Sequence, residues 1–403
     1  MTAASPLARA EMAPRDPILG LTEQYNADKN PKKVNLGIGV YTDEAGKVPL
    51  LECVKRAETQ LLEQAAPHSY LPIDGLPTYD RAVQSLVFGA ETAAVKEGRV
   101  ITVQALGGTG GLKVGADFLK VVAPEAGVYI SDPSWENHRA LFEQAGFKVD
   151  TYPYYDPKTH GVDFDAMLTG MRKIPNGSIV VLHACCHNPT GVDLTPDQWT
   201  PVMEIVRSRG LVPFMDIAYQ GFGEDIDTDG AAVRRFAQAG LPVFVSNSFS
   251  KSFSLYGERA GAMSVATQSK DEAARVLSQV KRLVRTNYSN PPSHGGHVIA
   301  RILLDEGLRS LWEKELGQMR DRIRAMRGLL VEKIHSRVPG ADFSFILKQK
   351  GMFSYSGLTR DQVVRMREEF GVYALESGRI CCAALNMGNI DYSADSIAKV
   401  LKG

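Results

Sequence analysis

Residues 243–265 read VFVSNSFSKSFSLYGERAGAMSV. The apolar run at 243–245 is typical of a buried strand, and small polar residues follow it. Within them stands one lysine, Lys251, between Phe249 and Phe253. Lysine is rarely buried without a reason, and loss of water lowers the pKa of its amine and makes it a nucleophile toward carbonyl groups. The stretch therefore predicts a reactive lysine at the end of a buried strand.

Two residues near this lysine are of the kinds that hold phosphate. Ser248 offers a hydroxyl, and Arg259 offers a planar fork of donors. Together with Lys251 they indicate an aldehyde cofactor that carries a phosphate, which is pyridoxal 5'-phosphate. A solvated loop with a surface lysine explains this stretch alone equally well, so the rest of the chain has to decide.

From Ile101 onward, apolar runs alternate with segments of helical spacing. The first predicted strand begins near 101, and the later strands cover 128–131, 149–152, 178–183, 211–215 and 243–245. The helices between them include 112–122, 164–171 and 231–239. This alternation predicts an α/β fold with a mainly parallel sheet and helices on both faces. Ligands bind such sheets beyond the carboxyl ends of the strands. Five polar or aromatic residues stand at predicted strand ends: Trp135, Asn188, Asp216, Tyr219 and Lys251. Their shared placement predicts one site.

A glycine-rich loop, GGTGG at 107–111, precedes the predicted helix 112–122. The free N–H groups of such a turn, here at Gly108 and Thr109, suit a phosphate. The loop lacks the spacing of a dinucleotide-binding or Walker loop, so by itself it is a weak signal that an ordinary turn explains better.

The length of 403 residues predicts two domains. In the last third of the chain, apolar residues recur every three or four positions from Leu308 to Ile334, which predicts a long helix. Short strands near 343–346 and 352–355 and a helix at 361–370 complete a smaller α+β domain. We expect an N-terminal arm at 1–15, a small domain formed by 16–47 and 315–403, and a large cofactor-binding domain at 48–314.

Bulk composition restricts the functional class. Lys+Arg and Asp+Glu both number 46, which argues against nucleic-acid or membrane-surface binding driven by charge. No apolar run reaches the length of a membrane span, and the N-terminus has no signal-peptide core. The five cysteines lack C-x-x-C spacing, which favours reduced, buried thiols in a cytoplasmic protein. We expect no metal site, because adjacent Cys185 and Cys186 point to opposite faces of a strand.

A pyridoxal phosphate enzyme needs a buried carboxylate beside the ring nitrogen, and Asp216 fits that need. Donors to the ring's phenolic oxygen, a flat partner for the ring and a phosphate cradle complete the predicted cofactor set: Tyr219, Asn188, Trp135, Gly108, Thr109, Ser248 and Arg259. Taken singly, Asp216 is also compatible with a turn or helix cap, and Trp135 and Tyr219 with core packing.

Five motifs together carry a family resemblance. They are SDPSWENH (131–138), CCHNPTG (185–191), FMDIAYQGF (214–222), SNSFSKSFSLYGERAG (246–261) and SGR (377–379). The chain resembles the class I, fold type I aminotransferases, and within them the aspartate/aromatic subgroup, from about residue 16 to the C-terminus.

The resemblance implies a homodimer with two active sites at the subunit interface. It implies that Lys251 bonds covalently to the cofactor, and that Arg379 grips the substrate α-carboxylate with Gly39, Trp135 and Asn188. Tyr70 is expected to reach the partner's cofactor phosphate. Arg285 is expected to enter the partner's site and pair with a side-chain carboxylate. His138 is expected to support Asp216.

The implied reaction is a ping-pong transfer of the amino group of aspartate or aromatic amino acids to 2-oxoglutarate, giving oxaloacetate or an aromatic 2-oxo acid plus glutamate. Subtype markers are mixed: Val40, Thr109 and Asn290 favour the aspartate type, whereas Ser69, Thr42 and Ala384 depart from the usual residues. A non-catalytic ligand sensor would need an added DNA-binding domain, for which the arm is too short. Arg379 with Arg285 favours transamination of dicarboxylates over β-elimination or decarboxylation.

Overall fold

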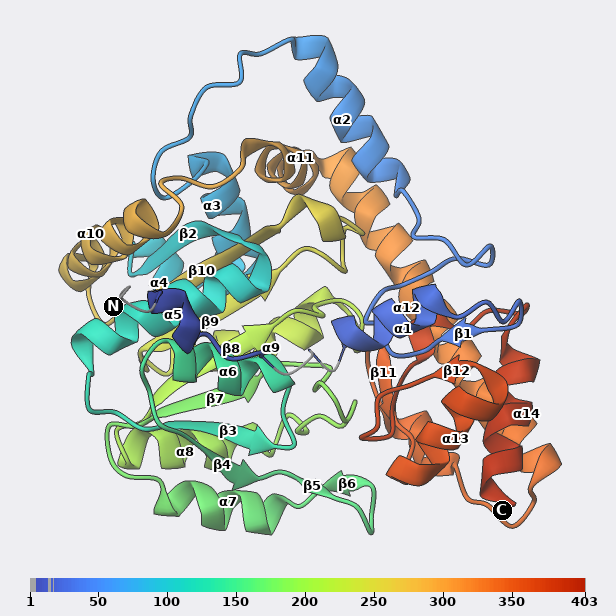
Figure 1. Ribbon diagram of the computed structural model, residues 1–403. Coiled ribbons are helices and arrows are strands. Elements are labelled where there is room, and N and C mark those ends of the chain that lie inside the picture. Colours follow the sequence, from blue (N-terminus) through green and yellow to red (C-terminus); the bar gives the residue numbers. More distant parts are fainter. Residues whose placement is uncertain (1–4, 14–15, 17, 403) are drawn as a thin grey trace.

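The computed structural model describes residues 5–13, 16 and 18–402, and it confirms the predicted α/β architecture (Figure 1). Within these residues a central sheet has seven strands. Their spatial order is β2 (Val100–Leu106), β10 (Ala260–Ala266), β9 (Val243–Ser248), β8 (Val212–Ile217), β7 (Ile179–His183), β3 (Val128–Asp132) and β4 (Val149–Pro153). Strand β10 runs antiparallel to both of its neighbours, and the other strand pairs are parallel.

Helices cover both faces of this sheet (Figure 1). They are α5 (Gly107–Val122), α6 (Glu136–Gln144), α7 (Phe164–Lys173), α8 (Trp199–Ser208), α9 (Ile226–Gln238) and α10 (Lys270–Asn287), with α3 (Pro77–Gln84), α4 (Ala93–Lys96) and α11 (Ser293–Leu304) beside them. Along β7, Ile179 and Val181 belong to one apolar cluster, while Val180 and Leu182 belong to the other. Because both faces are covered, the strands are continuous apolar runs, which is what made them visible in the sequence.

The C-terminal elements form a second group, at the right of Figure 1, which also holds residues 19–35. Its elements are α1 (Leu19–Ala27), α13 (Arg360–Phe370), α14 (Ile390–Leu401) and two small sheets, which pair β1 (Val34–Asn35) with β12 (Val372–Tyr373) and β11 (Phe353–Tyr355) with β13 (Arg379–Cys381). The long helix α12 (Glu306–Arg337) links this group to the rest, and α2 (Glu52–Gln64) packs near its start. The division into domains at 47/48 and 314/315 stays a prediction, and residues 1–4 and 14–15 of the expected arm lie outside the described residues.

Two sequence predictions of secondary structure were wrong. The expected strand at 343–346 is a 3-10 helix, Ser344–Lys348, whose first turn is fixed by the Asp342 carboxylate accepting from the Ser344 N–H. Helix α5 begins at Gly107 rather than at 112.

Tertiary packing explains the early start of α5. A Cβ at Gly111 would lie 2.6 Å from the Ser246 hydroxyl and 2.7 Å from the Ala262 carbonyl oxygen. The first turn therefore needs glycine to approach β9 and β10, and this contact outweighs the low helix propensity of glycine.

Within the described residues, no helix combines the length and the apolar character that crossing a bilayer requires. The five cysteines are buried and free, as their spacing predicted.

Substitution of Gly261 tests how closely β10 approaches the start of α5. A Cβ at this position would lie 2.4 Å from the backbone carbon of Gly107, and neither backbone can move easily. We expect Gly261→Ala to lower the free energy of unfolding by about 1–3 kcal/mol, measured by urea denaturation. Gly328→Ala in α12 is the control, because nothing lies within 4 Å of that position. A neutral Gly261→Ala would contradict the tight contact.

Candidate active site

A cavity of about 210 Å³ lies beyond the carboxyl ends of the parallel strands. It brings together eleven of the predicted site residues: Gly39, Gly108, Thr109, Trp135, Asn188, Asp216, Tyr219, Ser248, Lys251, Arg259 and Arg379. They come from segments as far apart in sequence as residues 39 and 379. The shared position at strand ends, inferred from the sequence, is thus a shared cavity in the fold.

The loop that carries Lys251 is fixed by its aromatic flanks. Phe249 and Phe253 are buried, and Phe253 stacks on Trp312 of α12 with ring centroids 4.6 Å apart. The Trp312 indole N–H donates to the Ser252 carbonyl at 2.7 Å. A solvated loop does not fit these contacts, so the alternative left open by the sequence is excluded.

The surroundings of Lys251 favour its neutral form. Burial lowers the pKa of Lys251 to about 8, and the positive charges of Arg259 and Arg379 act in the same direction, while Asp216 opposes them. The ammonium group lies 5.1 Å from the ring centroid of Tyr219. At neutral to mildly alkaline pH, this lysine therefore has a sizeable fraction of nucleophilic amine.

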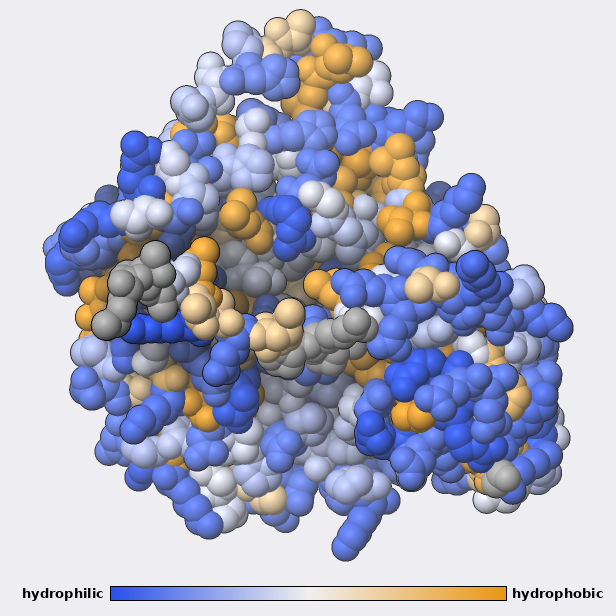
Figure 2. Space-filling model, viewed as in Figure 1, coloured by the Kyte–Doolittle hydropathy of each residue, from blue (hydrophilic) through white to orange (hydrophobic). Residues whose placement is uncertain are grey.

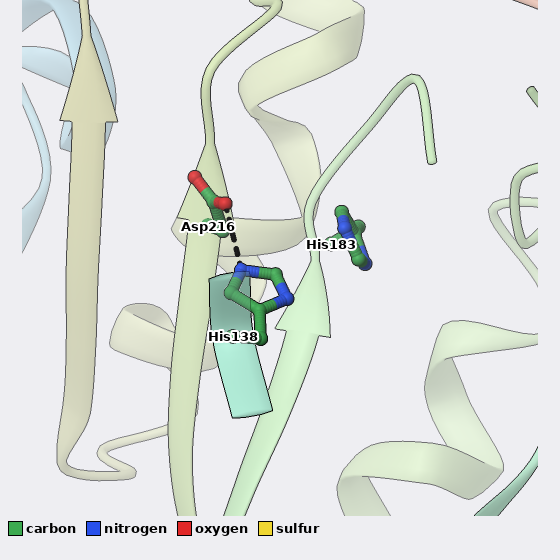
Figure 3. A group of neighbouring side chains, drawn as sticks. All are labelled: His138, His183 and Asp216. Atoms are coloured by element: carbon green, nitrogen blue, oxygen red, sulfur yellow. Dashed lines mark hydrogen bonds and ion pairs between the residues drawn. The ribbon is translucent and has the colours of Figure 1, made fainter. Parts of the chain in front are cut away.

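Asp216, at the end of β8, is held from one side by a histidine. Its Oδ2 lies 3.0 Å from Nε2 of His138 on α6 (Figure 3). Nδ1 of His138 lies 3.0 Å from the Ser134 hydroxyl. The other oxygen, Oδ1, is buried and has no hydrogen-bond partner among the described residues. That oxygen is free to accept from a protonated ring nitrogen.

The charge of Asp216 follows from two opposed effects. Burial acts to raise its pKa, but the hydrogen bond and charge of His138 outweigh it, so the pKa lies below the usual value. His183, on the adjacent strand in Figure 3, adds no charge, because burial holds its pKa well below the ordinary range. Asp216 is therefore a carboxylate at neutral pH.

One end of the cavity is built to receive an anion. The guanidinium of Arg259 reaches over Gly107, where a Cβ would lie 2.4 Å from its Nη2. Its Nη1 donates to the Tyr256 carbonyl at 3.0 Å, which sets its direction. The first turn of α5 and the Ser248 hydroxyl line the same cavity. A guanidinium, a hydroxyl and helix N-terminal N–H groups together fit a phosphate.

The same cavity presents a buried guanidinium, that of Arg379. Its Nη1 donates to Asn188 Oδ1 at 2.9 Å, its Nη2 donates to the Gly37 carbonyl at 2.7 Å, and its face lies 4.0 Å from the ring centroid of Phe353. Its Nε is buried without a partner, and it forms no ion pair within the described part of the chain. A buried cation with unmet donor capacity calls for a carboxylate from a ligand.

Comparison with known proteins identifies the family. Residues 31–397 match the profile of the family described as aminotransferase class I and II. This chain belongs to that family. The predicted subgroup, fold type and reaction class are confirmed, since the curated and solved relatives are aspartate and aromatic-amino-acid aminotransferases.

Three relatives illustrate the similarity. The aspartate aminotransferase of Pseudomonas aeruginosa is 60% identical over 391 residues, which is 97% of this chain and 98% of that protein. The aromatic-amino-acid aminotransferase of Escherichia coli is 52% identical, covering 96% and 98%. The crystal structure of the Burkholderia pseudomallei aromatic-amino-acid aminotransferase, covalently bound to pyridoxal phosphate, has a TM-score of 0.96 and 63% identity, covering 98% of this chain and all of that one.

Sequence reasoning missed part of the aminotransferase cavity. The additional lining residues are Ile18, Leu112, His183, Cys185, Ala218, Ser250, Tyr256 and Phe353. Ser250 and Tyr256 stand inside the motif that was quoted first, and Cys185 stands beside Asn188. Phe353 had no local signal, because its role depends on a contact with Arg379 across separate strands.

Two predicted residues lie outside this cavity. Tyr70 is 93% exposed, and Arg285, exposed near the end of α10, hydrogen-bonds to the Ser289 hydroxyl. The family resemblance assigned both to the partner's site, and that assignment stays a prediction.

The lowered pKa of Lys251 can be tested on the cofactor-free aminotransferase. Because only the neutral amine reacts, labelling by trinitrobenzenesulfonate should rise with pH around a midpoint of about 8, measured by peptide mapping. An ordinary lysine is under about 1% neutral at that pH. The Asp216 carboxylate stabilises the ammonium form of Lys251. Asp216→Ala removes it and should therefore shift the midpoint to lower pH. A midpoint equal to that of a short lysine peptide would contradict the assignment.

Proposed function

We propose that this aminotransferase transfers the amino group of aspartate and of aromatic amino acids to 2-oxoglutarate by a ping-pong cycle, giving oxaloacetate or an aromatic 2-oxo acid plus glutamate. The observation that carries the proposal is the buried Arg379, with its unmet Nε, in the same cavity as Lys251 and Asp216. It supplies a carboxylate site beside a reactive amine. The relatives named for aspartate and for aromatic substrates support both donor classes.

The cofactor is pyridoxal phosphate, and the residues present fit it. Lys251 provides the amine for the covalent bond, and Asp216 Oδ1 provides the free acceptor for the ring nitrogen. The remaining cofactor contacts that we assign are Gly108, Thr109, Ser248 and Arg259 for the phosphate, Trp135 for the ring face, and Tyr219 and Asn188 for the phenolic oxygen. When bound, pyridoxal phosphate supplies an electron sink for the bond at the substrate Cα.

The chain's own groups then bind the substrate and move the proton. Arg379, aided by Asn188, Gly39 and Trp135, holds the substrate α-carboxylate. With the cofactor bound, Lys251 Nζ would carry the proton from the substrate Cα to the cofactor within one half-reaction, and in the opposite direction when the 2-oxo acid is aminated in the other. Burial raises the pKa of Tyr219, so its phenol stays neutral and donates a hydrogen bond.

We assign the working form as a homodimer in the cytoplasm. In Figure 2 hydrophobic residues gather over α2 and the elements beside it, at the top of the view. Leu50 and Leu62 are 63% and 82% exposed, and Tyr70 follows in the same segment. Exposed apolar side chains of this density are typical of interfaces. A second copy covering this face would receive Tyr70 and Arg285 into its site. The free, buried cysteines support a cytoplasmic location.

Removal of the ring carboxylate tests the chemistry. In Asp216→Ala the cofactor should stay bound, because Lys251 and the phosphate contacts remain. Proton transfer at the substrate Cα should slow by roughly 100-fold or more in single-turnover assays, because a preorganised charge is lost. Asp132→Ala, which removes an exposed acid at the end of β3, two strands away from β8 in the sheet, should react normally. A near-normal rate for Asp216→Ala would make Asp216 a structural cap.

Removal of Arg285 tests the substrate assignment. Losing one partner of a desolvated charge pair costs about 2–5 kcal/mol, or roughly 30- to several-thousand-fold. Arg285→Ala should lower kcat/KM for aspartate within that range and change the value for phenylalanine much less, measured in a donor panel with 2-oxoglutarate as acceptor. Arg282→Ala, one turn earlier on α10, is the matched control.

The same residue tests the shared site. Mixing Arg285→Ala with Lys251→Ala subunits should restore one complete site per heterodimer. Equal losses for aspartate and phenylalanine would rule out the assigned role of Arg285, and absence of complementation would rule out its action across the interface.

A further inference from the structure

A second cavity, of about 480 Å³, lies between the loop after β8, helix α12 and residues 347–351. It shares no lining residue with the active-site cavity. Its walls carry four cationic side chains, Arg324, Arg327, Lys348 and Lys350, and one carboxylate, Glu224. Glu224 is divided between two of them, with Oε2 2.7 Å from Arg324 Nη2 and Oε1 2.9 Å from Lys350 Nζ. The lining side chains thus carry more positive than negative charge, while the charges of Asp193 and Asp229 reach Lys350 from outside the lining.

Arg327 is the most informative residue of this cavity, because it is a cation that is only 3% exposed. Its Nε donates to the Ser354 hydroxyl, and its Nη2 donates to the carbonyls of Gly351 and Phe353. Across the described residues it forms no ion pair with a carboxylate, and its Nη1 has no hydrogen-bond partner. A buried guanidinium without a counter-charge is unfavourable, so its exposed edge in the cavity is suited to an anion.

The acids behind the cavity do not meet this need. The Asp229 carboxylate accepts from the backbone N–H groups of Gly221, Gly223 and Glu224. The Asp193 carboxylate accepts from those of Cys186 and His187. Both acids are engaged with backbone donors rather than with Arg327, which leaves the cationic edge available to a ligand.

We propose that this cavity binds inorganic phosphate. Cationic donors from α12 and from the 347–351 segment surround one space, and a compact dianion with acceptor oxygens on several sides matches them better than a single planar carboxylate does. Arg327 Nη1 and Lys348, which have no carboxylate partner in the described structure, are the main contacts, and Arg324 and Lys350 share their charge with Glu224.

The binding test uses the cofactor-saturated dimer and inorganic phosphate, measured by isothermal titration calorimetry. We expect one phosphate per subunit, with a Kd roughly ten-fold higher in Lys348→Met and in Arg324→Gln, as for loss of one charge-assisted hydrogen bond. Lys314→Met removes an exposed lysine of α12 that does not line the cavity, and this variant should bind phosphate as the wild type does. Arg379→Lys should also bind normally, which separates this cavity from the active site. No binding at millimolar phosphate, an unchanged Kd in Lys348→Met, or loss of binding in Arg379→Lys would overturn the proposal.

The cavity is also connected to the substrate arginine. Arg327 holds the Phe353 carbonyl, and the Phe353 ring lies against the Arg379 guanidinium. Saturating phosphate should therefore change KM for aspartate, by roughly five-fold for ordinary coupling, in the wild type and not in Lys348→Met. This kinetic readout rests on the proposed function, whereas calorimetry does not, so the two fail separately. An equal response of both enzymes would refute the connection.

Discussion

The buried carboxylate of Asp216 is the constraint on which the active site depends. A charge enclosed at the end of β8 is unfavourable unless other groups compensate it, and His138 satisfies one oxygen only. The second oxygen faces a cavity whose other charged groups are Lys251, Arg259 and Arg379. One carboxylate therefore shares the cavity with three basic side chains, an arrangement that favours anionic ligands.

The fold produces this arrangement because strand β10 runs antiparallel to its neighbours. Parallel neighbours need a crossover helix, whereas antiparallel β9 and β10 are joined directly by residues 249–259. That loop therefore stays at the carboxyl edge of the sheet, and it carries both Lys251 and Arg259. Glycines at 107 and 261 let the start of α5 approach the same edge. The lysine, the phosphate cradle and the carboxylate thus depend on one local exception in a parallel sheet.

The small sheets position Arg379, which we assign to the substrate carboxylate. Arg379 lies on β13, and its partner strand β11 carries Phe353, whose ring meets the guanidinium. The buried Arg327 of α12 donates to the same strand, at the Phe353 carbonyl and the Ser354 hydroxyl. Arg327 lines the cationic cavity and also contacts the strand that packs on Arg379. A change at α12 therefore has a short structural route to the site that we assign to the substrate carboxylate.

By itself, the sequence determined the alternation of strands and helices along the chain, because each central strand is buried on both faces and must be a continuous apolar run. It also determined the polar residues at the strand ends, because chemistry-bearing side chains there sit in fixed motifs. Prediction failed where local pattern and packing disagree: the apolar residues of 343–346 form a 3-10 turn, and the glycines of 107–111 are helical. Tertiary structure alone decided that Phe353 joins the cavity, that Asp216 Oδ1 lacks a partner, and that Arg327 is a buried cation. These properties arise from contacts between segments far apart in the chain, and no local spacing encodes which atoms such contacts leave unsatisfied.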